Sequence, residues 1–401
     1  MNCYVLGAGV SKSVNYPLGS ELFDAIDQFV RQSGPCIDRF DYQKDWEDLT
    51  RWLEGNPNPT IAQAYRTRNI EHLFTVLDFA DELRNDALLN TFHSRASSKL
   101  REKKAEAFGM YDRTVEDYGR FRRILLWALE HYFSQRHCED VQNSKDPNWD
   151  ALRAFGNSLA PGDVVITFNY DATVERVLLG QGRWSPRDGY GFEIVFQQSR
   201  DDRTVVDPWG RSAVTVLHVH GATGWYRRPF FAPGYVPQGS RAVPFEVFGA
   251  APAQTQISLD PEFLTGLGIF NAVDACLPDK IAVPHERHVV LHPSFLKDYL
   301  SDEGVIAALW QRAAEALRRA DRVFIVGYSL PKADSAALTL LLTSCADGRA
   351  RIINPHGGTK VKLGSLLHTG DSFQGTAYFE DWALSGCPER IPWKPREKEA
   401  V

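Results

Sequence analysis

Short apolar segments that end in small or polar residues recur along the chain and alternate with segments of helical spacing. The first covers residues 3–6 and runs into Gly7-Ala8-Gly9. The later ones cover residues 164–168, 214–219, 289–291, 322–326 and 351–353. Between them, as in residues 18–30 and 305–320, apolar side chains recur every three or four positions. Strands that alternate with helices predict an α/β fold, with a Rossmann-like, doubly wound and mostly parallel sheet covered on both faces.

Two long segments interrupt this alternation. Residues 45–158 show helical spacing and predict a large helical insertion. Residues 222–284 are rich in proline, glycine and aromatic residues with little periodicity, which predicts a loop-rich insertion. We therefore expect one catalytic region, residues 1–387, followed by a frayed tail, residues 388–401. Its Rossmann-type core is expected from residues 1–44, 159–221 and 285–387.

The composition excludes several classes of protein. With 43% hydrophobic residues the chain can form a real core, and a net charge of −6 argues against a surface built mainly for nucleic acid or anionic lipid. The basic stretch 95–123 also contains glutamates at helical pairing distance, as on a solvated helix face. The chain starts without a basic leader, and no apolar run approaches the ~18 residues of a membrane span. We expect a cytoplasmic protein that contacts neither a membrane nor nucleic acid directly.

Cysteine and histidine spacing argues against a metal site. The six cysteines lie far apart and form no CxxC pair, whereas zinc ribbons need closely spaced thiolates. The competing signal is His285, His288 and His292, of which the last two share a face if they lie in a strand. No neighbouring carboxylate pattern completes a known site. We therefore expect reduced thiols and no metal.

Polar and small residues gather where the predicted strands end. In a doubly wound sheet ligands bind at the carboxyl ends of the strands, so these residues are expected to meet in one crevice. The candidates are Gly7, Ala8, Gly9, Ser11, Thr167, Asn169, Asp171, His220, Gly327, Tyr328, Ser329 and Asn354. A glycine turn before a helix lets backbone amides approach a pyrophosphate. The third glycine of a dinucleotide fingerprint is replaced by Lys12, which disfavours an ordinary dehydrogenase.

Each of these residues has a structural interpretation as well as a functional one. The glycines could form only a tight turn. Asn169 and Asp171 could bond a carboxamide and a ribose, or make a turn and cap a helix. His220 could act as a general base near a ribose hydroxyl or a water, or be a packed polar group. The residues alone leave these alternatives open.

Taken in order, five motifs resemble the sirtuin-like family, and most closely its bacterial antiphage-defence branch of NAD glycohydrolases. The motifs are GAGVS, ITFNYD, VHG, VGYSLP and IINP, which together extend from Cys3 to about Asn354. The resemblance implies a Rossmann-type domain with inserted modules. It also implies that the GAGVS residues Gly7, Ala8, Gly9 and Ser11 hold the pyrophosphate and the neighbouring ribose.

The later motifs carry the remaining implied contacts. Asn169 and Asp171 match the family motif around the nicotinamide ribose, and His220 matches the family histidine. Gly327, Ser329 and Asn354 match positions that hold the adenosine half, with Tyr328 and Thr167 as further cofactor-binding candidates from the same motifs.

Two departures favour hydrolysis of NAD over removal of an acyl group from lysine. Deacylating members carry a four-cysteine zinc module between the histidine and the late glycine-serine motif, where this chain has only Cys276. Their Pro-Asp-Phe-Arg pattern is also missing, since Pro17 is followed by Leu18 and Gly19. We therefore predict an NAD+ glycohydrolase that releases nicotinamide and ADP-ribose without a metal. Asn169 would position water or ribose, Asp171 would assist at the ribose, and His220 would be the general base.

The resemblance also implies a biological setting. In this setting, called abortive infection, the protein depletes the NAD+ of the infected cell. It does so as a homo-oligomer that assembles with a HerA-like hexameric ATPase. Residues 45–158 are the candidate assembly surface. The alternatives are an NAD-dependent protein deacylase, an ADP-ribosyl transferase, and a regulatory module that binds NAD or ADP-ribose without turnover. A nucleic-acid-triggered effector would need a second recognition domain, which the sequence does not indicate.

Overall fold

The structure is a computed structural model of the 401-residue chain. It describes residues 1–32, 42–56, 59–82, 146–185, 188–192, 194–196, 210–227, 246–250, 267–270, 287–290, 293, 305–331, 334–369 and 377–388, with single positions between 121 and 139. His285, His292, residues 95–120 and residues 389–401 lie outside this set, so what the sequence predicts for them stays a prediction.

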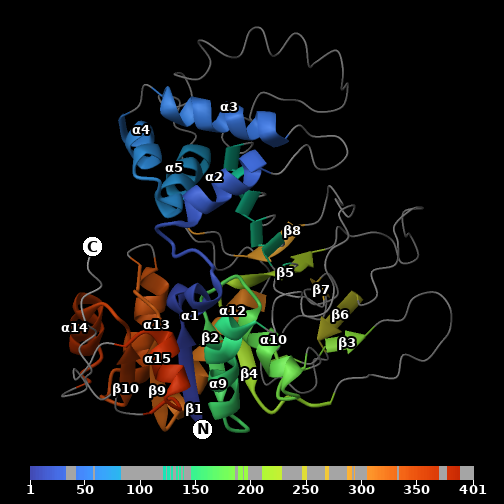
Figure 1. Ribbon diagram of the computed structural model, residues 1–401, viewed down its shortest axis with the longest axis vertical. Coiled ribbons are helices and arrows are strands. Elements are labelled where there is room, and N and C mark those ends of the chain that lie inside the picture. Colours follow the sequence, from blue (N-terminus) through green and yellow to red (C-terminus); the bar gives the residue numbers. More distant parts are fainter. Residues whose placement is uncertain are drawn as a thin grey trace, which may run out of the picture. The chain divides into compact units, whose positions relative to one another are not determined.

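The central element is a five-stranded parallel sheet (Figure 1). Its order is β10 (Ala350–Ile353), β9 (Arg322–Val326), β1 (Asn2–Leu6), β2 (Val164–Thr167) and β4 (Thr215–His218). The chain builds β1, β2 and β4 outward in one direction and then returns to place β9 on the other side of β1. This reversal creates a topological switch point between β1 and β9. The predicted Rossmann-like α/β fold is confirmed.

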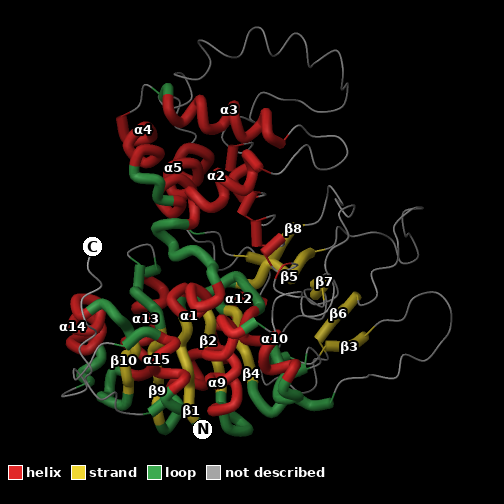
Figure 2. The backbone as a smooth tube through the Cα atoms, viewed as in Figure 1, coloured by secondary structure: helices red, strands yellow, loops and turns green. Residues whose placement is uncertain are grey.

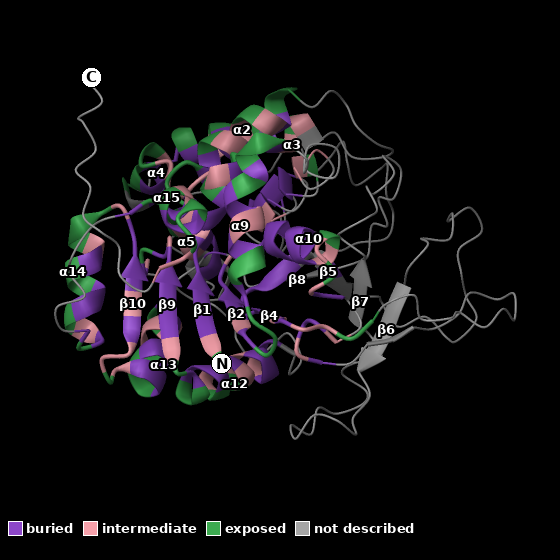
Figure 3. Cartoon of the chain, turned by 60° about the horizontal axis from the view of Figure 1, so that its bottom comes forward, coloured by how far each residue is buried: buried purple, intermediate pink, exposed green. Residues whose placement is uncertain are grey.

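The register of the sheet aligns the ends of its strands. Leu6, the last residue of β1, is opposite Thr167 on β2 and Val326 on β9. The strands are apolar on both faces and largely buried, as Figure 3 shows for β10, β9, β1 and β2. Parallel strands read as nearly continuous hydrophobic runs for this reason. The residues that follow them therefore emerge along one edge.

Helices flank this sheet (Figure 2). Tyr4 and Phe324, which are partners in the β1–β9 register, stack with ring centroids 5.1 Å apart. Tyr4 also meets Phe155 of α9 (Asp150–Ser158), and Phe324 meets Trp382 of α15 (Phe379–Leu384). The 3-10 turn η2 (Pro147–Trp149) leads into α9, and α10 (Thr173–Gly180) packs against it. These aromatic contacts form the core between the parallel sheet and the helices α9 and α15.

Three further helices alternate with the last strands of the parallel sheet. The helices α12 (Val305–Arg319) and α13 (Ser335–Cys345) pack together, and α14 (Gly357–Leu366) packs against β10. At the other end of the chain, α1 (Ala8–Ser11) and the 3-10 turn η1 (Lys12–Val14) follow β1 directly. No helix in the described ranges is long and apolar enough to cross a membrane.

A second sheet occupies part of the segment for which the sequence predicts loops. Its five strands pair antiparallel in the order β3 (Ile194–Phe196), β6 (Glu246–Ala250), β7 (Leu267–Phe270), β5 (Gly221–Arg227) and β8 (Arg287–Val290). Sequence reasoning missed β3, β5, β6 and β7. Glycines such as Gly224, Gly249 and Gly268 interrupt the strand alternation in the last three, and β3 is only three residues long.

The chain divides into two compact units. The first combines Met1–Leu18, Phe133–Leu291 and Asp298–Val401 and contains both sheets. The second combines Gly19–Tyr132 with His292–Lys297. Its described helices include α2 (Leu22–Gln32), α3 (Tyr42–Glu54), α4 (Pro59–Arg66) and α5 (Ile70–Glu82). The helical unit thus starts earlier than the predicted insertion, residues 45–158, and α9 belongs to the unit with the sheets.

Candidate functional site

Glycines bring the ends of β1 and β9 into direct contact at the switch point. The Gly7 amide donates to the Val326 carbonyl at 3.0 Å, and the Gly9 amide donates to the Gly327 carbonyl at 3.0 Å. A Cβ atom on Gly9 would lie 2.8 Å from the Cα atom of Gly327, and Gly327 itself has a φ of +60°. Only glycine permits both the contact and the backbone conformation. The amides of Gly7 and Gly9 therefore hold β9, which favours the structural interpretation of this turn.

Side-chain and backbone hydrogen bonds hold Asn169 at the ends of the strands. Its Nδ2 group donates to the Gly7 carbonyl at 3.1 Å and to Ser11 Oγ at 2.9 Å. Its backbone N–H donates to Thr167 Oγ1 at 3.1 Å. The side chain remains half-buried, whereas Ser11 and Thr167 are buried.

The network determines which way the Asn169 carboxamide faces. The Ser11 hydroxyl donates its single hydrogen to Asp171 Oδ2 at 2.7 Å, so Ser11 Oγ must accept from Asn169. The Gly7 carbonyl can only accept as well. Both N–H groups of the amide are thus used within the protein, and Oδ1 has no partner among the described residues. This oxygen is the atom available to a hydroxyl group or a water.

Asp171 supports Ser11 and does not present its carboxylate to solvent. Its Oδ1 atom accepts the Thr173 hydroxyl at 2.6 Å and the Thr173 amide at 3.2 Å. Burial raises the pKa of the Asp171 carboxyl, although hydrogen bonds from Thr173 and Ser11 act in the opposite direction. The aspartate therefore forms an Asx-type turn before α10 and braces the serine that orients Asn169.

His220 is buried among aromatic rings at the end of the turn after β4. Its ring centroid lies 5.0 Å from Phe168, 6.3 Å from Tyr170 and 6.2 Å from Trp310. Phe168 and Tyr170 are the neighbours of Asn169 in the chain, so the packing places the histidine beside the segment that carries this asparagine. The Trp310 indole donates to the Val219 carbonyl at 2.7 Å and holds the turn.

The late motif contributes Tyr328, which stacks on Phe168 with centroids 4.5 Å apart. Asn354 follows β10 and donates through Nδ2 to the Tyr328 carbonyl at 3.3 Å, while its Oδ1 accepts the His356 amide at 2.9 Å. Asn354 is buried and joins the ends of β9 and β10. Ser329 is exposed in the loop, and Ala8 is half-buried at the start of α1.

Sequence reasoning missed a buried histidine behind Asn169. His218 Nδ1 lies 3.2 Å from the Asn169 carbonyl oxygen, and Nε2 contacts the Glu175 carboxylate of α10. Both side chains are almost completely buried. Burial lowers the pKa of His218, but the charge of Glu175 and its hydrogen bond outweigh this effect and raise the pKa above its ordinary value. The available signal was a second histidine two residues before His220, at the end of the predicted strand 214–219.

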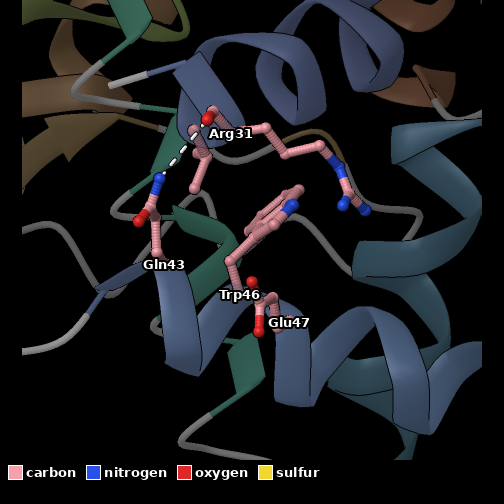
Figure 4. Close-up of a pocket in the computed structure, with 5 residues that line it drawn as sticks. Arg31, Gln43, Trp46 and Glu47 are labelled. Carbon is pink, nitrogen blue, oxygen red and sulfur yellow. Dashed lines mark hydrogen bonds between the residues drawn. The ribbon is translucent and has the colours of Figure 1, made fainter. Parts of the chain in front are cut away.

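A cavity of about 240 Å³ lies in the second unit. Val30, Arg31, Gln43, Trp46 and Glu47 line it (Figure 4). Gln43 Nε2 donates to the Arg31 carbonyl at 3.3 Å, and the Arg31 guanidinium pairs with Asp27 at 2.8 Å. None of the strand-end candidates lines this cavity.

The described residues contain no group of three or more histidine, cysteine, aspartate or glutamate side chains that could hold a metal ion. Of the three histidines considered for a metal, only His288 is described, and it pairs with Tyr226 in the second sheet.

No protein-family model matches the chain, and no curated protein is significantly similar to it.

Proposed function

We propose that the protein hydrolyses the N-glycosidic bond of NAD+ and releases nicotinamide and ADP-ribose. The observation that carries this proposal is the orientation of Asn169, whose amide nitrogen is held by Gly7 and Ser11. Its oxygen therefore faces away from those contacts, at an edge of the sheet where doubly wound folds bind nucleotides. His220 lies beside the same segment.

These residues suit the breaking of a bond at a sugar carbon. The C1′–N bond breaks with its electron pair going to nicotinamide, and the sugar becomes oxocarbenium-like. Asn169 Oδ1 accepts a hydrogen bond from the attacking water or from a ribose hydroxyl and so fixes its position. His220 takes the proton that the water loses as the new C1′–O bond forms. The reaction consumes one water and yields nicotinamide, ADP-ribose and a proton.

The order of the five strand-end motifs supports the same assignment by resemblance. We propose further that the activity serves antiphage defence by depleting NAD+, in a homo-oligomer that a HerA-like ATPase partner controls. A protein deacylase, an ADP-ribosyl transferase and a binding module without turnover are the competing functions, and each gives a different product pattern.

The deciding experiment incubates the purified protein with NAD+, alone and with a HerA-like ATPase, and follows nicotinamide by chromatography. We expect release by the wild type and a loss of about 10²-fold or more in Asn169→Ala and in His220→Ala, because each removes a positioning or proton-accepting group. The matched controls are Asn157→Ala and His368→Asn, which change exposed residues and should retain activity.

Unchanged rates in Asn169→Ala and His220→Ala would remove these catalytic roles. Release that requires an acylated peptide would identify a deacylase, and transfer of ADP-ribose to protein would identify a transferase. Binding of NAD+ with no product under any condition would identify a regulatory module.

A further inference from the structure

Asp334 lies immediately before α13 and is turned toward His220. Asp334 Oδ1 is 3.5 Å from His220 Nε2, and Asp334 Oδ2 accepts the Tyr328 hydroxyl at 2.8 Å. The Asp334 and His220 side chains are 2% and 5% exposed, so water screens their interaction little. On the basis of the proposed function, we infer that Asp334 is the positioning residue that holds His220 ready to accept a proton.

The ordinary explanation for an aspartate at this position is helix capping, and the structure does not support it. A capping aspartate accepts a hydrogen bond from a backbone N–H in the first turn of the helix. Asp334 is the N-cap residue of α13, but its side chain makes no such bond. Its two oxygens instead face a phenol and an imidazole. Asp334 thus occupies a capping position, but its side chain contacts two of the strand-end residues, Tyr328 and His220.

A carboxylate at this distance selects one form of the histidine. An ionised carboxylate can only accept hydrogen bonds, so it favours a proton on Nε2 of His220 and leaves the lone pair of the neutral ring on Nδ1. When the ring takes up a second proton, the imidazolium forms next to the negative charge of Asp334. Asp334 thus favours both the correct tautomer before the reaction and the cation produced by it. The separation of 3.5 Å is compatible with such a role, because catalytic hydrogen bonds tighten when substrate binds.

Tyr328 holds the carboxylate in this orientation. Its ring is stacked on Phe168 at an interplanar angle of 10°, and its carbonyl accepts the Asn354 amide. The phenol is thereby fixed by the ends of three strands, β2, β9 and β10. Asn354, which the resemblance assigns to the adenosine half, and Tyr328, a further cofactor-binding candidate, thereby acquire a role in supporting the proton acceptor.

The test combines steady-state kinetics with a double-mutant cycle. Asp334→Asn keeps the shape of the side chain but removes its charge, and we expect kcat for nicotinamide release to fall about 10²-fold with KM for NAD+ within about threefold. Tyr328→Phe should lower kcat about tenfold in the same way. Asp347→Asn is the matched control, since Asp347 is an exposed aspartate after α13, and it should retain the wild-type kcat. In a His220→Ala background, Asp334→Asn should cause no further loss, because the residue acts through the histidine.

A measurement that needs no activity addresses the positioning role directly. In protein with ¹⁵N-labelled histidine, the resonances that disappear in His220→Gln identify His220. We expect the wild type to show the Nε2–H tautomer, and Asp334→Asn, but not Asp347→Asn, to shift the two ring nitrogens toward a tautomer mixture. An unchanged spectrum in Asp334→Asn, or equal losses from Asp334→Asn with and without His220, would overturn the inference. If the wild type releases no nicotinamide, the proposed function fails, and the tautomer measurement still decides whether Asp334 controls His220.

Discussion

Asn169 makes four hydrogen bonds, two through its side-chain amide, to Gly7 and Ser11, and two through its backbone, to Thr167 and His218. Gly7 follows β1, Ser11 ends α1, Thr167 ends β2, and His218 ends β4. A half-buried amide that is restrained in this way loses little further freedom when it binds a substrate, which suits a group that must position a reacting atom. At the residue scale, the orientation of Asn169 is therefore set by the residues that surround it.

The His218–Glu175 pair makes stability depend on pH. A histidine whose pKa is raised in the folded state contributes stability that is fully present below its unfolded pKa of about 6.5. That contribution is lost as the pH rises through the folded-state pKa. We therefore expect the urea midpoint of the wild type to decrease as the pH is raised above about 6.5 relative to that of Glu175→Gln, measured from about pH 5.5 to about pH 9. The exposed His368→Asn should follow the wild type, and parallel curves for the wild type and Glu175→Gln would contradict the assignment.

At the scale of elements, the contact between the β1 turn and the β9 turn determines what the strand ends can hold. The two segments approach so closely that the Gly9 amide reaches the Gly327 carbonyl. This contact puts Tyr328 over Phe168 and thus connects the motif after β9 to the motif after β2. The spacing of the glycine motif predicts a pyrophosphate site, whereas its observed hydrogen bonds show a packing role that spacing alone does not reveal.

Gly327 is the position where this contact can be tested. An alanine there would have a φ of +60° and a Cβ atom 2.8 Å from the Val10 nitrogen. Gly182 has a similar φ of +65°, and a Cβ atom added there would meet no other atom within 4 Å. Gly182→Ala therefore measures the cost of the positive φ alone, without a steric clash. We expect a loss in the free energy of unfolding of about 1 kcal/mol for Gly182→Ala and of about 3 kcal/mol or more for Gly327→Ala. If urea unfolding shows equal losses of unfolding free energy for Gly182→Ala and Gly327→Ala, the β1–β9 contact accommodates the added Cβ atom without an energetic cost.

At the scale of the whole molecule, every described candidate of the strand-end cluster belongs to the first unit. The second unit has its own core, in which Trp46 stacks on Phe23 and donates to Asp27 at 2.8 Å. The described residues proposed to bind NAD+ therefore all come from the unit that contains the sheets. Assembly with a partner through residues 45–158 is a separate proposal.

This division predicts where NAD+ stabilises the protein. In His220→Ala, which should bind without turnover, NAD+ at about 100 times its Kd should add about 2.7 kcal/mol to the stability of the folded state. Hydrogen exchange followed by mass spectrometry should slow in peptides covering residues 3–12, 166–172 and 324–331. Residues 43–53 and 70–80 of the second unit should exchange as before. Protection confined to the second unit would place the ligand elsewhere.

The sequence alone determined the class of fold and the edge of the sheet at which the polar and small strand-end residues gather. Apolar runs and helical periods are local signals, and a parallel sheet necessarily gathers the carboxyl ends of its strands along one edge. In the second sheet, β8 overlaps the predicted strand 289–291, whereas β5, β6 and β7 were missed because glycine weakens the period-two pattern on which their recognition depends.

Only the tertiary structure decided which strand-end residues face one another. The orientation of Asn169, the pairing of His218 with Glu175 and the approach of Asp334 to His220 all join segments that are far apart in the chain. Such contacts depend on strand order and register, which no local pattern encodes. The sequence could name Asn169 and His220 as candidates, but the buried groups that orient them became visible only when β1, β2, β4 and β9 were placed side by side.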